Sequence, residues 1–127
     1  MNNEENAWSN KIIGACIEVH RSLGPELLES IYQECLAHEF FLQQIPFQRE
    51  MAKPIEYKGV HMECGLRLDF VVAGLVVVEL KAVDKILPVH KAQVLTYLKL
   101  TGCKLGLLLN FNVPVFKDGI ERIALNL

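Results

Sequence analysis

Three charged residues interrupt segments that are otherwise apolar. Asp69 lies within the run 68–72, and Glu79 and Lys81 lie within the run 76–83. Charged side chains are rarely buried unless they pair or bind a metal. Carboxylates suit Mg²⁺, which keeps several waters and needs only one or two protein carboxylates. A lysine beside them can orient a water or stabilise charge on a phosphate. The simpler interpretation is an ion pair between Glu79 and Lys81, with Asp69 in solvent.

Two pairs of polar residues are predicted to lie on helices. Glu29 and Tyr32 are three residues apart on one helical face, and Gln93 and Tyr97 are four apart on another. Glu29 can simply be a carboxylate that interacts favourably with the positive N-terminal end of a helix dipole. Gln93 and Tyr97 can simply form a hydrogen-bonded pair at the boundary of the core. Alone, neither pair indicates a site.

The loop that joins two expected strands, 60–72 and 75–83, decides whether Asp69 and Glu79 can share one ion. A two-residue loop would place Asp69 and Glu79 on opposite faces. A three-residue loop at 73–75, or a bulge near Asp69, would place them opposite each other with their Cβ atoms about 5 Å apart. We predict this second arrangement, with Asp69, Glu79 and Lys81 facing the helix that carries Glu29.

The hydrophobic periodicity predicts the elements that must position these residues. It changes from helical to strand-like spacing after residue 46. We expect helices over 8–21, 25–43 and 88–100, and strands over 47–57, 60–72, 75–83, 105–110 and 120–125. This order predicts an α/β fold of α+β order, with a mixed central sheet flanked by helices. We expect one domain over 1–127, with residues 1–7 flexible.

Composition restricts the class of protein further. The chain has 127 residues, of which 51% are hydrophobic and 22% charged, an ordinary globular balance. No apolar segment reaches the roughly twenty residues of a membrane span, and the acidic N-terminus does not look like a signal peptide. The spacing of the four cysteines fits no zinc pattern. We therefore expect reduced thiols and a cytoplasmic location.

Charge is distributed unevenly along the chain. Residues 1–46 hold two basic and seven acidic residues, and residues 47–127 hold eleven basic and eight acidic residues, so the net charges are −5 and +3. A polyanion should therefore contact the second part.

Taken together, the polar residues form the ordered array Glu29, Asp69, Glu79-x-Lys81 and Gln93-xxx-Tyr97. This array resembles the PD-(D/E)XK nuclease superfamily and its RecB-like branch, whose pattern adds a helical Glu before the core and QxxxY after it. The neighbouring sequence resembles the small stand-alone GxxExxY proteins in the segments 19–25, 28–32, 78–83, 90–99 and 106–111. The resemblance covers residues 8–125 and implies a restriction-endonuclease-like core.

The resemblance implies a role for each charged residue. Asp69 and Glu79 would bind Mg²⁺ or Mn²⁺, with the backbone carbonyl of Leu80 as a candidate third ligand. Lys81 would position the attacking water or the scissile phosphate. Glu29 would hold a second metal, directly or through water.

Further residues take supporting roles by the same resemblance. Gln93 would orient the site, and Tyr97 would pack behind it or touch substrate. His90 is a candidate for lining the cleft. His20 is a candidate metal ligand, although a histidine near a helix C-terminus can also simply interact favourably with the helix dipole. The glycine of the family pattern aligns with Glu26, which we expect in a first helical turn.

The implied function is metal-dependent hydrolysis of phosphodiester bonds in nucleic acid, with DNA as the first candidate substrate and RNA as the second. The alternative is a catalytically weak or inactive binding or regulatory module that keeps the fold, and a third is a structural homo-oligomer with fortuitous charges. The short chain leaves no room for a target-recognition domain or for an arm that encloses a duplex. We expect a homodimer, with strand 120–125 offering a free edge.

Overall fold

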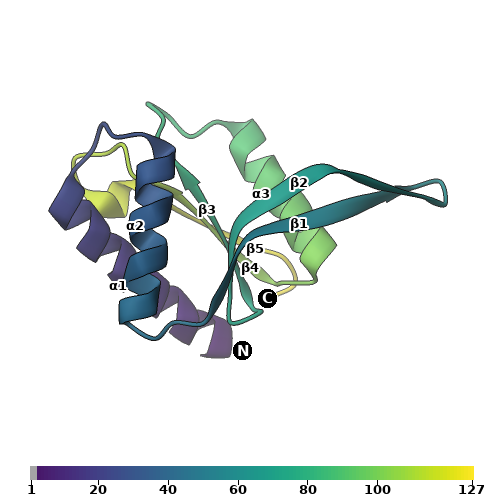
Figure 1. The fold of residues 1–127 in the computed structure, drawn as a ribbon, viewed down its shortest axis with the longest axis horizontal. Coiled ribbons are helices and arrows are strands. Elements are labelled where there is room, and N and C mark those ends of the chain that lie inside the picture. Colours follow the sequence, from purple (N-terminus) through teal and green to yellow (C-terminus); the bar gives the residue numbers. More distant parts are fainter. Residues whose placement is uncertain (1–2) are drawn as a thin grey trace.

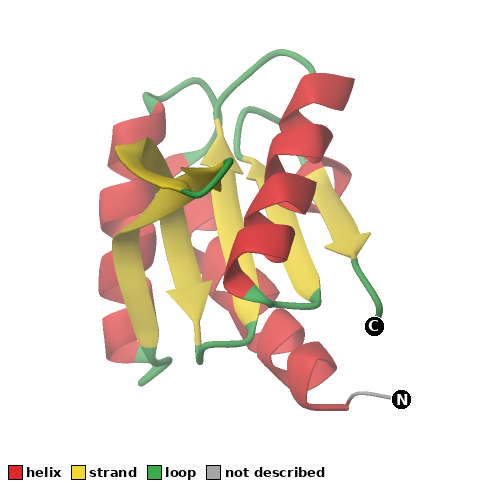
Figure 2. Cartoon of the chain, turned by 90° about the vertical axis from the view of Figure 1, so that its right-hand side faces the viewer, coloured by secondary structure: helices red, strands yellow, loops and turns green. Residues whose placement is uncertain are grey.

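The protein consists of a central mixed sheet with helices on both faces (Figures 1 and 2). The computed structural model describes residues 3–127, without the side chains of residues 64 and 65. Its elements, in chain order, are α1 (Asn3–Leu23), α2 (Glu29–Leu42), β1 (Phe47–Tyr57), β2 (Val60–Val72), β3 (Val76–Lys81), α3 (Pro88–Thr101), β4 (Leu105–Asn110), the 3₁₀ turn η1 (Phe116–Gly119) and β5 (Ile120–Ala124). The five strands lie in the order β1-β2-β3-β4-β5. The predicted mixed sheet is confirmed.

The strand order follows from how the chain connects the strands. β3 and β4 are parallel, with α3 as the crossover between them, and the other neighbouring pairs are antiparallel. β5 lies at one edge of the sheet, as we expected. Its pairing with a second copy of the chain stays a prediction.

The core has two parts, one on each face of the sheet. α1 and α2 cover one face, where Ile12, Cys16, Tyr32, Leu36 and Phe40 meet the alternate residues of β3 and β4. On the other face α3 packs Tyr97 and Leu98 against Leu68, Val71 and Val77. Figure 2 shows α3 alone in front of the sheet. No helix in the described residues is both long and apolar enough to cross a membrane.

The first two helices differ from the expected bounds. α1 already begins at Asn3, so residues 3–7 are helical, whereas residues 1 and 2 lie outside the described part. α2 begins only at Glu29, with Leu28 as its N-cap. Leu28 and Ile31 are 71% and 39% exposed. Tyr32, Leu36 and Phe40, which follow at helical spacing, are buried.

The loop between β2 and β3 has the predicted three residues. Val72 pairs with Val76 and Phe70 with Val78 across the two strands. The N–H of Leu75 donates to the carbonyl of Val72 over 2.9 Å. Gly74 supplies a left-handed residue, with φ of 67°, as the loop requires.

β1 and β2 continue past the sheet as a two-stranded ribbon (Figure 1). The sequence did not predict this projecting ribbon, which needs no additional domain. That the chain has no arm enclosing a duplex stays a prediction. The ribbon turns at Asp69: Phe70 packs under α1 and α2, whereas Leu68, two residues away, packs under α3. A regular strand would place both on one face. Glu50, which lies opposite this point on β1, has a left-handed φ of 52°.

The segment between α1 and α2 is held by specific hydrogen bonds. The hydroxyl of Tyr32 donates to the carbonyl of Gly24 over 2.6 Å and accepts the N–H of Leu27 over 3.2 Å. The N–H of Glu26 donates to Oδ1 of Asn112 over 2.9 Å. Glu26 has a φ of 71° and lies outside the helix, which corrects the expectation of a first helical turn. A glycine fits this position better than glutamate does, because it tolerates a positive φ.

We predict that Glu26→Gly stabilises the protein. A left-handed L-residue is strained by about 1–2 kcal/mol, whereas the added chain entropy of glycine costs about 0.5–1 kcal/mol. The side chain of Glu26 is exposed, so little packing is lost. Urea denaturation should show a gain of up to about 1 kcal/mol. Lys99→Gly, at an exposed position inside α3, should instead lose about 1 kcal/mol. A loss in Glu26→Gly would contradict the strain at this residue.

Candidate active site

Asp69 and Glu79 meet where β2 and β3 separate. The register that pairs Phe70 with Val78 places Asp69 opposite Glu79. Side chains here replace the backbone ladder: the N–H of Asp69 donates to Oε1 of Glu79 over 2.8 Å, and the N–H of Leu80 donates to Oδ2 of Asp69 over 2.9 Å. The two carboxyl groups also lie within hydrogen-bonding reach of each other. The predicted convergence of these side chains is confirmed.

Burial makes the two carboxyl groups hard to ionise together. Burial and the charge of Asp69 raise the pKa of Glu79 to about 8. Burial also raises the pKa of Asp69, against the N–H of Leu80 and the charge of Lys81. Among the described residues no ion pair within 4.0 Å joins Lys81 to Glu79, so the simple ion-pair interpretation is not supported. Two adjacent oxygen donors that repel each other when ionised fit a hard divalent cation.

Glu29 approaches this pair from the first turn of α2. Its side chain is half-buried. Burial and the charge of Asp69 raise its pKa, and the charge of Lys81 opposes this rise. Among the side chains that the structure describes, which exclude those of residues 64 and 65, no three from His, Cys, Asp or Glu are grouped closely enough to cage a metal. Glu29 is therefore an electrostatic neighbour of the pair, at a greater distance than a shared ligand set would require.

α3 supplies the other wall of the site. Glu79 alternates with Leu80 along β3 and shares the face of Val77, which packs with Tyr97. Burial and then the charges of Glu79 and Asp69 raise the pKa of the Tyr97 hydroxyl, which Gln93 opposes through a hydrogen bond. The site thus lies between α2 and α3. The prediction that Asp69, Glu79 and Lys81 face the helix of Glu29 is wrong for Glu79, because strand alternation directs its side chain toward α3.

The two histidines of interest have structural partners. Nε2 of His20 lies 2.7 Å from the carbonyl of Val113, and the ring packs against Phe116. This nitrogen therefore forms its hydrogen bond with the backbone of the loop before η1. Nδ1 of His90 accepts the N–H of Leu87 over 3.0 Å at the start of α3. Both contacts favour positioning of the chain over contact with an ion or substrate.

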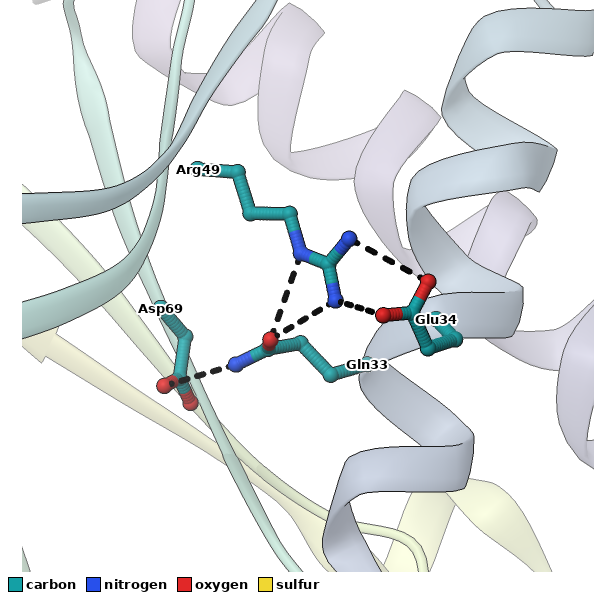
Figure 3. A network of polar contacts seen from close by, with 4 residues as sticks. All are labelled: Gln33, Glu34, Arg49 and Asp69. Atoms are coloured by element: carbon teal, nitrogen blue, oxygen red, sulfur yellow. Dashed lines mark hydrogen bonds and ion pairs between the residues drawn. The ribbon is translucent and has the colours of Figure 1, made fainter.

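Three residues beside Asp69 did not stand out in the sequence (Figure 3). Nε2 of Gln33 donates to Oδ1 of Asp69 over 3.0 Å. Arg49 donates to Oε1 of Gln33 through Nε over 3.2 Å and Nη2 over 3.0 Å. The same guanidinium contacts both carboxylate oxygens of Glu34, at 2.7 and 3.3 Å. One available signal was the spacing of Gln33 from Glu29, since residues four apart share a helix face.

Asn110, also missed, fixes the end of the strand that carries Lys81. Its buried amide accepts the N–H of Val83 over 3.1 Å and donates to the carbonyl of Val83 over 2.9 Å. The N–H of Phe111 donates to the carbonyl of Lys81 over 2.9 Å. The backbone beside Lys81 is therefore held from β4. A polar residue ending the apolar run 105–109 was the signal.

Comparison with known proteins bears on the family and the fold. A sequence profile of the PD-(D/E)XK nuclease superfamily matches residues 6–123. No curated protein matches significantly. The crystal structure of SSO0001 is similar, with a TM-score of 0.56 and 24% sequence identity, over 77% of this chain and 50% of that chain. This chain thus spans about half of that protein, and at this identity the likeness supports the fold alone.

We predict that the metal-free protein loses stability as the pH rises from about 5 to about 8. Folded Glu79 keeps its proton up to a pKa of about 8, whereas an unfolded glutamate loses it near about 4.3. The folded state binds more protons in this window, so rising pH favours unfolding. Urea denaturation in EDTA across the window measures the slope.

Glu79→Gln should flatten this slope, because glutamine does not ionise. Glu56→Gln, at an exposed position on the ribbon, should keep the slope of the parent. Equal slopes in the parent and Glu79→Gln would show that Glu79 does not hold the proton.

Proposed function

The chain belongs to the PD-(D/E)XK nuclease superfamily. On this premise we propose that it is a metal-dependent nuclease that hydrolyses phosphodiester bonds in nucleic acid, with DNA as the first candidate substrate and RNA as the second. One observation carries the proposal: Asp69 and Glu79 converge on each other through backbone N–H groups of the opposite strand. Within the superfamily we place the chain with the small GxxExxY proteins, on the segments that resemble them.

Each side chain has a role that its position supports. Asp69, Glu79 and the carbonyl of Leu80 would hold Mg²⁺ or Mn²⁺, since oxygen donors suit these ions. When bound, the metal supplies Lewis acidity and a water of lowered pKa. Lys81, on the face of Glu79, would hold the attacking water or a phosphate oxygen. Glu29 would hold a second ion, directly or through water.

The aromatic wall completes the site. Gln93 orients the hydroxyl of Tyr97 through their hydrogen bond. Tyr97 is almost fully buried, which suits packing behind the carboxylates and leaves little of it for substrate.

A second candidate function is a nucleic-acid-binding or regulatory module with little turnover. The chain has a net charge of −2, and Arg49, the basic residue closest to Asp69 in the hydrogen-bond network, is paired with Glu34. Both features weaken attraction for a polyanion. This candidate keeps the fold and the metal site but predicts no cleavage.

The test is incubation of the protein with single- and double-stranded DNA and RNA in the presence of Mn²⁺. The parent should cleave at least one substrate, and EDTA should abolish cleavage. Asp69→Asn and Lys81→Ala should each reduce the rate by about 100-fold or more, since the first removes a charged ligand of the metal and the second removes the cation that would hold the attacking water or a phosphate oxygen. Both variants should fold, because neither side chain is a core contact.

Lys85→Ala, in the loop after β3, is the matched control and should cleave like the parent. Cleavage that survives in both Asp69→Asn and Lys81→Ala would refute the assigned site. Metal binding without cleavage of any substrate would favour the binding module.

We also propose a homodimer, for which the β5 edge offers backbone groups for pairing. Light scattering after gel filtration should give twice the mass of 14.4 kDa. A monomeric mass at high protein concentration would refute the dimer.

A further inference from the structure

We propose that Gln33 is a positioning residue for Asp69, and that Arg49 and Glu34 hold it in the one orientation in which it can act. The four side chains form a relay from the surface of α2 to the candidate metal site (Figure 3). The inference rests on the proposed function, because it concerns how tightly that site binds its metal.

The first step is the orientation of the Gln33 amide. A guanidinium can only donate hydrogen bonds, and an ionised carboxylate can only accept them. Arg49 donates twice to Oε1 of Gln33, at 3.2 and 3.0 Å. The amide nitrogen must then point the other way, where it donates to Oδ1 of Asp69 over 3.0 Å. Reversal of the amide would break all three bonds, so the relay has one direction.

The second step is the anchoring of Arg49. It contacts Glu34, the residue that follows Gln33 on α2, so one guanidinium bridges two consecutive side chains. The side chains of Arg49 and Glu34 are 28% and 70% exposed. Ion pairs as exposed as this contribute little to stability, about 0–1 kcal/mol. The contribution of the pair is therefore mainly geometric.

The third step is why Asp69 needs support. It lies where the ribbon turns and the regular pairing of β2 with β3 ends at Phe70. Its Oδ2 accepts the N–H of Leu80, and its Oδ1 accepts Gln33. Because both oxygens are held, the plane of the carboxylate is fixed, and each oxygen keeps a lone pair for a cation. Groups that orient metal ligands in this way typically change metal affinity about 10- to 100-fold.

The test is the affinity of the whole protein for Mn²⁺, measured by calorimetric titration of the parent and of Gln33→Met. Methionine keeps the length of glutamine but makes none of the three hydrogen bonds. We expect Gln33→Met to bind Mn²⁺ at least about tenfold more weakly. Arg49→Lys, which keeps the charge but loses the paired N–H donors of the guanidinium, should weaken Mn²⁺ binding by a smaller factor.

Gln43→Met is the matched control. Gln43, the C-cap at the other end of α2, donates to Glu39 over 2.6 Å, so the same change removes a side-chain hydrogen bond there without altering the contacts of Gln33. Its affinity for Mn²⁺ should equal that of the parent. A folded Gln33→Met that binds Mn²⁺ as tightly as the parent would overturn the inference.

A spectroscopic measurement separates positioning from simple packing and needs no variant at Gln33. The side-chain amide signals of Gln33 in the NMR spectrum should shift when Mg²⁺ is added to the parent, because the metal binds the carboxylate that accepts this amide. The shift should be absent in Asp69→Asn. Unchanged signals in a parent that binds Mg²⁺ would also overturn the inference, whereas a parent that binds neither metal would instead refute the proposed function.

Discussion

The register between β2 and β3 is the constraint on which the site depends. Side chains in a strand alternate between faces, so one residue more or less in the loop would separate Asp69 from Glu79. The observed pairing of Val72 with Val76 keeps them together. Strand alternation then sets what surrounds them: Glu79 faces α3, and the turn of the ribbon at Asp69 opens the side from which α2 approaches.

Two neighbouring buried carboxyl groups are unfavourable unless something offsets their desolvation and repulsion. The protein uses fixed donors: the N–H of Asp69, the N–H of Leu80 and the amide of Gln33. These bonds do not fully offset the cost of burying a second charge beside Asp69, and the pKa of Glu79 is raised to about 8. A cation would lower this cost, and contacts from α2, β1 and β4 hold the two carboxyl groups and the adjoining strand end in place.

Much of this arrangement could be predicted from the sequence. Strand alternation and the break at Gly74 predicted the strands, because these depend on local spacing. The three-residue loop, and with it the convergence of Asp69 with Glu79, was predicted from the metal-site hypothesis, since spacing also allowed a two-residue loop. The late start of α2 could not be predicted, since it depends on contacts of the preceding segment with Tyr32 and Asn112. Gln33 and Arg49 look like ordinary surface residues until the fold brings β1 beside α2.

The most direct test of the account is the location of bound Mn²⁺ in crystals of the protein, from anomalous diffraction. The account predicts a peak between the carboxylates of Asp69 and Glu79, at a coordination distance of about 2.0–2.2 Å from oxygens of both, and no such peak in crystals of Asp69→Asn. Crystals grown in Mn²⁺ at neutral pH that show an intact Asp69–Glu79 contact without metal, or metal bound only elsewhere, would contradict it.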